Sequence, residues 1–342
     1  MMEPVKHMIE IFGTIGPACS DEKTLEEMFL NGMSGMRLNL SHSSLSASKE
    51  ALDHFHKAAR NAGVKAELLI DMQGPELRIG KVDQPYEIHD HEIVKLAISE
   101  GITIPSRVFE AVTIGDHILI DDGKIELCTE EKDETAIACS VIRGGIVSSR
   151  KSIKVVNKDI HGPVLTDKDL IDIKDAKKYG VSALMQPFVT SGEQLKEVRR
   201  ILDTQGCSDI RIFAKIESRE GIAKLEEIVK YADMIVIARG DLGNDMPLWE
   251  LPLRQKEIEQ ICIAHNKPFL VVTQMLTSMI HSPVPTRAEV SDIFNAVNDG
   301  CSAVMVTNET AAGEYPVEAI RYLYQTAKAA EQWRNSQKKE EN

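Results

Sequence analysis

Long apolar runs are missing from this sequence: none approaches the ~20 residues that a membrane-spanning helix needs. The first ten residues, MMEPVKHMIE, also lack the apolar stretch of a signal peptide. The six cysteines are scattered singly, with no CxxC pair, which argues against a disulfide framework and against a cysteine-based zinc site. We therefore expect a cytoplasmic protein with reduced thiols and no membrane association.

Positive charge is scarce as well. The chain has 40 Lys and Arg residues against 53 Asp and Glu residues, a formal net charge of −13. This balance argues against nucleic acid as a partner. If the substrates are anions, a local cluster of Lys and Arg must overcome the overall field. The hydrophobic content of 43% is that of an ordinary globular protein.

Short apolar runs alternate with charged segments of helical pattern, which predicts repeated βα units and a parallel sheet. Eight runs have this character: Ile9–Ile15, Gly35–Leu40, Ala66–Met72, Ser182–Phe188, Arg211–Glu217, Met234–Asp241, Pro268–Met275 and Ala303–Thr310. Eight such units favour an α/β fold of the (β/α)8 TIM-barrel type.

The connection between the third and fourth runs is far longer than the others. It contains short β-type segments, and Asp122-Gly123 between alternating apolar residues predicts a hairpin. Pro75 and Pro163 stand at its two ends. We therefore predict a small β-rich lid at residues 76–161, inserted after strand three of a barrel formed by residues 1–75 and 162–342. Without the insertion, the chain is close to the ~250 residues typical of one such barrel.

Polar and charged residues gather at the expected carboxyl ends of the strands, where the loops of such a barrel build the active site. The residues at these ends are Arg37, Asn39, Ser41, His42, Asp71, Lys215, Glu217, Arg239, Gly240, Asp241, Thr273, Gln274, Glu309 and Thr310. Because clustered charge is unfavourable without a ligand, we expect the functional site at this rim.

Lys215 and Glu217 are two residues apart, so on a strand they face the same side. The pair alone is equally compatible with a structural salt bridge. Asp241 closes the next strand, ~4.8 Å away, and two neighbouring carboxylates repel unless a cation bridges them. Two hard oxygen ligands with room for substrate and water suit Mg2+ or Mn2+. Lys215 would then stabilise an enolate or a transferring phosphoryl group.

Two further rim features remain open to more than one interpretation. The segment ARGDLG at 238–243 can begin a short helix whose N–H groups bind a carboxylate or phosphate, but glycine also marks ordinary turns. Asn39, Ser41 and Asp71 form an oxygen-rich set on adjacent strands. The set is compatible with a monovalent-cation site or with a hydrogen-bonded polar cluster.

Several long motifs resemble those of the pyruvate kinase family and occur in the family's order, from Ile11 to about Ala330. They are GTIGPAC at 13–19, MRLNLSH at 36–42, DMQGPELRIG at 71–80, IDDG at 120–123, AKIESREG at 214–221, ARGDLG at 238–243, TQMLTSM at 273–279, PTRAEVSD at 285–292 and NETAAGEYPVEA at 308–319. The family is a group of glycolytic kinases that transfer a phosphoryl group between phosphoenolpyruvate and ADP, giving pyruvate and ATP. The resemblance implies this activity for the chain.

The resemblance also implies a role for each matching residue. Arg37 and Lys215 would contact the transferring phosphoryl group, and Lys215 would also stabilise the enolate. Thr273 would lie beside the methylene carbon that is protonated. Glu217 and Asp241 would bind the divalent cation, Mg2+ or Mn2+.

The remaining implied roles concern the substrate carboxylate, K+ and the nucleotide. The backbone of Gly240 and Asp241 would hold the carboxylate. Four groups would bind K+: Asn39, Ser41, Asp71 and the carbonyl of Met72. Three residues would serve ADP or ATP: His42, Arg78 and, from the lid, Lys151.

Some positions depart from the family pattern. Gln73 stands where the family has Lys, Asn308 where it has Gly, and residues 151–157, KSIKVVN, replace a lid segment with two glycines and a proline. Two alternatives to the kinase therefore stay open. One is an enzyme that enolises or decarboxylates a 2-oxo acid such as oxaloacetate, and the other is a diverged or regulatory paralogue.

The sequence ends soon after the last expected barrel helix. Family members usually continue into a C-terminal domain that carries effector binding and one subunit interface. We therefore expect a form without this domain, either a monomer or a barrel-to-barrel homodimer.

Overall fold

The computed structural model describes residues 9–340, apart from residues 42, 76, 122, 159 and 161. The chain divides into two compact units. Within the described residues, the first unit runs up to Gly74 and also comprises Val164–Leu242 and the chain from Trp249 onward. The second unit consists of Pro75–Pro163 and Gly243–Leu248. The sequence pattern gives no sign that this short later segment belongs to the second unit.

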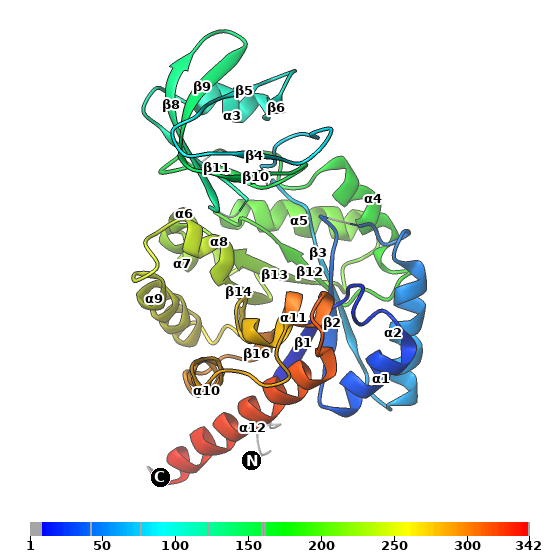
Figure 1. Ribbon diagram of the computed structural model, residues 1–342. Helices are drawn as coiled ribbons and strands as arrows, with labels where there is room; N and C mark the ends of the chain where they lie inside the picture. Colours follow the sequence, from blue (N-terminus) through cyan, green and yellow to red (C-terminus); the bar gives the residue numbers. More distant parts are fainter. Residues whose placement is uncertain are drawn as a thin grey trace. The chain divides into compact units, whose positions relative to one another are not determined.

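The first unit is a closed barrel of eight parallel strands, so the predicted barrel fold is confirmed (Figure 1). Its strands are β1 (Glu10–Thr14), β2 (Gly35–Asn39), β3 (Glu67–Asp71), β12 (Ala183–Gln186), β13 (Arg211–Ile216), β14 (Met234–Ala238), β15 (Phe269–Val272) and β16 (Ala303–Met305). Neighbours around the barrel follow the order β1-β16-β15-β14-β13-β12-β3-β2. Chain order is thus kept, and every strand pairs with its neighbours in the βα succession.

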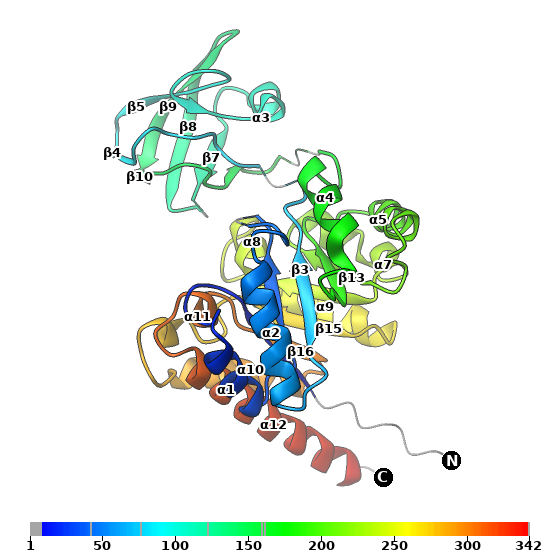
Figure 2. The ribbon, with the colours of Figure 1, turned by 90° about the vertical axis from the view of Figure 1, so that its right-hand side faces the viewer.

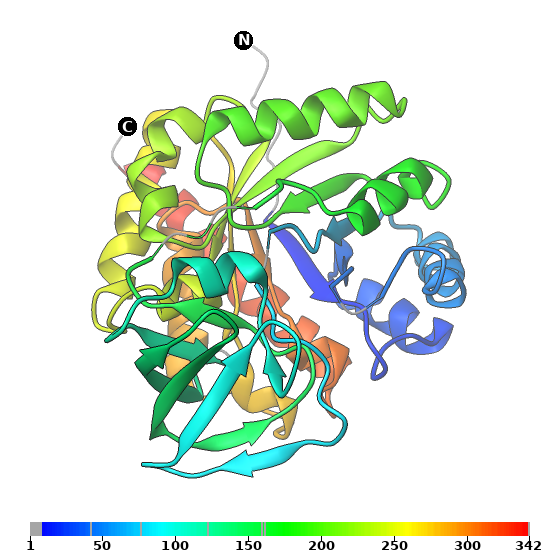
Figure 3. The ribbon, with the colours of Figure 1, turned by 90° about the horizontal axis from the view of Figure 1, so that it is seen from above.

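Helices follow these strands along the chain, and the longer ones cover the outside of the barrel. They are α1 (Glu22–Leu30), α2 (Lys49–Asn61), α4 (Asp167–Ala176), α5 (Gly192–Thr204), α6 (Arg219–Ala223), α7 (Leu225–Ile228), α8 (Arg239–Asn244), α9 (Leu251–Ala264), η1 (Thr277–Ile280), α10 (Arg287–Asn298), α11 (Asn308–Ala311) and α12 (Pro316–Glu340). Figure 2 shows α1 beside α2, and Figure 3 shows the outer helices surrounding the barrel strands. Among the described helices, none is long and apolar enough to cross a membrane.

The inner face of the barrel changes from apolar to charged along the strands. Leu69 and Phe213 are fully buried in the interior core. Two residues further along the same strands stand Asp71 and Lys215, which face the same side because side chains alternate along a strand. The barrel interior is therefore a packed hydrophobic core that ends in a charged layer at the carboxyl rim.

Several strands end earlier than the sequence pattern predicts, and β14 and β16 are followed at once by short helices. β14 stops at Ala238, whose last register partner on β15 is Val272, and α8 begins at the next residue. β16 stops at Met305, and α11 begins at Asn308. At Ala238 the neighbouring β15 has also ended, whereas β1 continues to Thr14 beside the chain that follows Met305; at both places the backbone goes on into a short helix. Asp241 and Thr310 consequently stand in short helices above the strand ends.

One buried carboxylate accepts hydrogen bonds from two segments: the one at which the chain leaves the barrel unit and the one at which it returns. Asp169, in the first turn of α4, is fully buried. Its Oδ1 accepts a hydrogen bond from the Gln73 amide at 2.9 Å, and its Oδ2 accepts from the Gly74 amide at 3.0 Å. The same Oδ2 accepts from the amide and the hydroxyl of Thr166, both at 2.8 Å. Asp169 therefore caps its helix and ties the two crossings together.

The second unit is built from β structure around its own core. Its elements are β4 (Tyr86–Ile88), β5 (Ile93–Ala97), β6 (Ile102–Thr103), α3 (Ser106–Ala111), β7 (His117–Ile120), β8 (Ile125–Lys132), β9 (Ala136–Arg143), β10 (Gly145–Val147) and β11 (Ile153–Val155). A six-stranded sheet has the order β11-β7-β8-β9-β5-β6, and β10 pairs with β4. The predicted hairpin joins β7 to antiparallel β8, although Asp122 itself lies outside the described residues.

Candidate active site at the carboxyl end of the barrel

Four charged side chains from three strands meet at the rim of the barrel. Arg37 on β2 binds Asp71 on β3, with its Nη2 2.7 Å and its Nε 2.8 Å from Asp71 Oδ2. Lys215 Nζ lies 3.3 Å from the same oxygen and 2.9 Å from Glu217 Oε1. The two-residue spacing of Lys215 and Glu217 thus places them together, and Asp71 joins both cations.

These charges are almost completely withdrawn from water. The side chains of Asp71 and Glu217 are 3% and 0% exposed, and that of Lys215 is 13% exposed. Burial opposes ionisation of Asp71, but the charges of Lys215 and Arg37 outweigh it and hold the pKa of this carboxyl below its usual value. Burial likewise opposes the charge on Lys215, but Asp71 and Glu217 outweigh it and raise the pKa of the ammonium. Asp71 and Lys215 are therefore a stable, fully charged pair.

Glu217 is in a different electrostatic situation. Burial, together with the nearby charges of Asp241 and Asp71, raises the pKa of Glu217 above its usual range, although Lys215 acts in the opposite direction. Too little positive charge surrounds this carboxylate. A carboxylate in that condition gains from an additional cation.

Within this charged cluster, two buried carboxylate oxygens have no hydrogen-bond partner among the described residues: Asp71 Oδ1 and Glu217 Oε1. The second is close to Lys215 Nζ, but the approach lacks hydrogen-bond geometry. The other oxygen of Glu217 accepts a hydrogen bond from the Phe188 amide at 2.8 Å. Unsatisfied buried oxygens of this kind are rare and call for a ligand.

Asp241 follows β14, the strand next to β13, and its side chain makes no hydrogen bond or ion pair with a described residue. It is partly exposed, unlike Glu217. Nowhere in the described part of the chain do three or more His, Cys, Asp or Glu side chains form a group that could hold a metal. A divalent cation at this rim would therefore have two protein carboxylates and would take its other ligands from substrate and water.

The loops after β14 and β15 meet through Gly240 and Thr273. The Gly240 amide donates a hydrogen bond to Thr273 Oγ1 at 2.8 Å. Thr273 has a φ of 75° and Phe188, at the end of the fourth barrel strand, a φ of 51°. Sequence reasoning missed Phe188, because a backbone N–H that binds Glu217 leaves no mark on residue type.

The residues considered for a monovalent cation lie on neighbouring strands. Asn39 is directly opposite Asp71 in the register of β2 and β3. Asn39 Oδ1 accepts the Ser41 amide at 3.1 Å. The ammonium of Lys168 on α4, which sequence reasoning also missed, contacts the carbonyls of Leu40 and Ser43. Lys168 of α4 thus holds the loop after β2.

Two rim residues expected to serve a ligand are used within the protein. Glu309 is buried and accepts hydrogen bonds from the amides of Leu276 at 3.2 Å and Thr307 at 2.7 Å. Thr310 Oγ1 accepts the Thr14 amide at 2.8 Å. These contacts join the end of the barrel to its first strand and to the loop after β15.

The residues assigned to the nucleotide belong to the second unit, except His42, which lies outside the described residues. Lys151 forms an ion pair with Asp121 at 2.8 Å. Arg78 Nη1 donates a hydrogen bond to the Arg150 carbonyl at 2.6 Å. The backbone of Arg78 also forms an isolated antiparallel β-bridge with Ser152.

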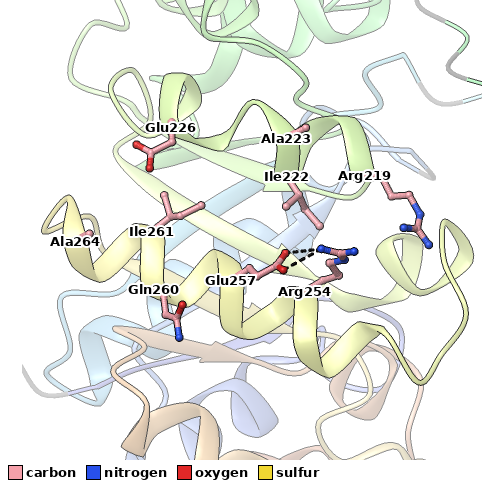
Figure 4. Close-up of a pocket in the computed structure, with 9 residues that line it drawn as sticks. All are labelled: Arg219, Ile222, Ala223, Glu226, Arg254, Glu257, Gln260, Ile261 and Ala264. Carbon is pink, nitrogen blue, oxygen red and sulfur yellow. Dashed lines mark hydrogen bonds and ion pairs between the residues drawn. The ribbon is translucent and has the colours of Figure 1, made fainter.

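A surface pocket of about 640 Å3 lies on the outer helices α6, α7 and α9 (Figure 4). Its apolar lining includes Ile222 and Ile261, and its charged wall includes Arg254, which is paired to Glu257 at 2.9 and 2.8 Å. None of the candidate rim residues lines it. The pocket is therefore separate from the charged cluster inside the rim.

Comparison with known proteins identifies the family of the chain. Residues 6–320 match the family described as "Pyruvate kinase, barrel domain". The chain is 36% identical to a pyruvate kinase of Geobacillus stearothermophilus over 338 residues, which cover 96% of this chain and 58% of the relative. It is 35% identical to a pyruvate kinase of Clostridium perfringens over 327 residues, covering 93% and 69% of the two chains. A pyruvate kinase of Mycobacterium intracellulare is 36% identical over 322 residues, 92% of this chain and 68% of the relative.

The chain thus spans 58–69% of the length of these relatives. The match extends over almost the whole sequence, through the barrel strands and the inserted unit alike. The chain belongs to the pyruvate kinase family.

Proposed function

We propose that the protein transfers a phosphoryl group between phosphoenolpyruvate and ADP, giving pyruvate and ATP. The observation that carries this proposal is the buried Lys215 ammonium at the carboxyl rim, 2.9 Å from Glu217 and 3.3 Å from Asp71. A cation this deeply buried stabilises negative charge that develops next to it far better than one in water. Membership of the family supports the same activity.

In this proposal Arg37 and Lys215 contact the transferring phosphoryl group. Both cations are tied to Asp71 Oδ2, so their charged ends are held in place before substrate arrives. Phosphoryl transfer depends mainly on such positioning and charge stabilisation. Once the phosphoryl group has left, the oxygen of the enolate carries the negative charge, and Lys215 stabilises it.

Glu217 and Asp241 are the proposed ligands of Mg2+ or Mn2+. The donor set fits a hard divalent cation: Glu217 Oε1 is buried without a hydrogen-bond partner among the described residues, and Asp241 is unpaired there. When bound, the cation would neutralise charge on the phosphoryl and enolate oxygens. Lys215 lies beside Glu217, so a cation held by the two carboxylates would add a second positive charge to that of the ammonium.

K+ is proposed to bind through Asn39, Ser41, Asp71 and the carbonyl of Met72. Asp71 Oδ1 is the observation that supports this, since it is buried and has no hydrogen-bond partner among the described residues. Oxygen donors of mixed charge suit a weakly held cation better than a transition metal.

The substrate carboxylate is proposed to bind the backbone of Gly240 and Asp241, and Thr273 to lie beside the methylene carbon. At present the Gly240 amide donates to Thr273 Oγ1 at 2.8 Å. A carboxylate that takes over this amide would free the Thr273 hydroxyl for the substrate carbon. For the nucleotide, family resemblance assigns Arg78, Lys151 and His42.

The test is a direct assay with phosphoenolpyruvate, ADP, Mg2+ and K+. Pyruvate is measured through NADH oxidation by lactate dehydrogenase, and ATP separately through luciferase, with reactions lacking ADP as the control. Equal formation of both products supports the proposal. Pyruvate formed from oxaloacetate, with no ATP formed from phosphoenolpyruvate, would instead favour the 2-oxo acid decarboxylase, which needs the same enolate stabilisation but no nucleotide.

A further inference from the structure

Two consecutive residues after β15 have a left-handed backbone: Thr273, with a φ of 75°, and Gln274, with a φ of 54°. A β-branched residue with positive φ is a genuine outlier, because its side chain crowds the backbone in that conformation. Neither residue is a glycine, so the strain is not relieved by residue type. Surrounding contacts must hold this conformation.

Arg239 supplies those contacts. Its Nη2 and Nε donate hydrogen bonds to the Thr273 carbonyl at 2.8 and 3.2 Å. Its Nη1 lies 2.8 Å from the carboxylate of Asp292 on α10, and only 12% of its side chain is exposed. The rigid guanidinium is therefore bonded in two directions, which fixes the peptide that follows Thr273.

The hydroxyl of Thr273 is held by the same loop. Thr273 Oγ1 accepts the amide of Gly240, the residue after Arg239, and donates to the Val272 carbonyl at 2.5 Å. If the backbone of Thr273 relaxed to negative φ, its side chain would point in another direction. Even after a substrate carboxylate has taken over the Gly240 amide, the direction of the hydroxyl therefore depends on Arg239 and, through it, on Asp292.

We propose that Arg239 is a positioning residue for proton transfer at the methylene carbon of the substrate, and that it acts through Thr273. This inference rests on the proposed function, in which Thr273 lies beside that carbon. In the step concerned, the enolate oxygen forms its carbonyl double bond while the carbon–carbon π pair takes the proton of the Thr273 hydroxyl. The hydroxyl is restored by a proton from water. In the reverse direction, pyruvate loses a methyl proton.

Two rates measured on the same protein distinguish a residue that positions the Thr273 hydroxyl from one that only stabilises the fold. One is ATP formation from phosphoenolpyruvate and ADP. The other is the exchange of pyruvate methyl protons for deuterium in D2O, followed by proton NMR with Mg2+, K+ and ATP present. We expect Arg239→Gln to slow the exchange at least tenfold more than it slows ATP formation. Added to Thr273→Ala, it should slow the exchange less than twofold further, because Arg239 acts only by placing the hydroxyl that Thr273→Ala has already removed.

Arg254→Gln is the matched control. Arg254 also forms a two-point pair with a carboxylate, Glu257, but on the outer helix α9 at the surface pocket (Figure 4). It should leave both rates within twofold of wild type. A crystal structure of the Arg239→Gln variant should show Thr273 with negative φ. If that variant does not fold, Asp292→Asn tests the same contacts. It should also slow proton exchange more than ATP formation, by a smaller factor than Arg239→Gln.

The outcomes distinguish the two proposals. A wild-type protein with neither ATP formation nor proton exchange would refute the proposed function and this inference with it. An active wild type, with equal losses of both rates in Arg239→Gln and Asp292→Asn, would overturn the inference alone. Retention of positive φ at Thr273 without Arg239 would overturn it as well.

Discussion

Replacement of Lys215 by Met is the sharpest test of the rim cluster. Methionine has a similar length and keeps the apolar stem packed, but it carries no charge. The change leaves Asp71 with Arg37 as its cation and leaves Glu217 with none among the contacts described above. Stability and catalysis should therefore both respond, by amounts that the geometry allows us to estimate.

At an effective dielectric constant of about 20, each contact of Lys215 at about 3 Å contributes roughly 5 kcal/mol of attraction before hydration losses are subtracted. Breaking a buried pair by removing one partner typically costs about 3–5 kcal/mol of stability. For catalysis, the loss of a buried cation beside the developing enolate charge should cost about 4 kcal/mol of transition-state stabilisation. That corresponds to roughly a thousandfold lower turnover.

The assay compares turnover and unfolding temperature of Lys215→Met with those of wild type. Lys196→Met is the matched control, because Lys196 also pairs with a carboxylate, Glu193 at 2.6 Å, but lies exposed on α5. An exposed pair of this kind contributes little, so the control should behave as wild type. A folded Lys215→Met protein with turnover within tenfold of wild type would refute the role given to this ammonium.

Three further predictions follow from other contacts. Glu217→Gln should weaken Mn2+ binding at least tenfold in isothermal titration calorimetry, and full activity in excess chelator would contradict a divalent site. Activity should require K+, so equal rates in K+, in Na+ and without monovalent cations would argue against the proposed K+ site at Asp71. Asp169→Ala should lower the free energy of unfolding in urea by about 2–4 kcal/mol, because it leaves buried amides without acceptors. Asp167→Ala, an exposed change in the same helical turn, should cost under about 1 kcal/mol, and equal effects of the two would show that the buried contacts matter little.

The barrel was predictable because its signal is local and repeated. Each strand is a short apolar run followed by a helical pattern, and the rule that sites lie at the carboxyl rim then selects few residues. The pairing of Lys215 with Glu217 follows from the alternation of side chains along one strand. These inferences need only the period of a strand and the topology of the barrel.

The missed features depend on contacts between distant segments. Nothing in the sequence TQM shows that Thr273 has a positive φ, because the strain is held by a guanidinium from the preceding loop and by Asp292 on α10. The strand ends were misjudged for a related reason: β14 stops at Ala238, opposite the last residue of β15, and the residues Arg239–Asp241 that the pattern added to the strand begin α8 instead. Likewise, only the folded chain reveals that Asp169 reaches Gly74.

The shared oxygen of Asp169 has a consequence in terms of polymer statistics. It accepts the amides of Gly74 and Thr166 together, so these two nitrogens lie within about 6 Å of each other. The chain between Gly74 and Thr166 is therefore a single loop of the barrel, and Asp169 holds its two ends together. The entropy of closing a loop grows only with the logarithm of its length. The third βα connection is thus a position at which evolution can enlarge, trim or exchange a whole folding unit, while the stability of the barrel changes little.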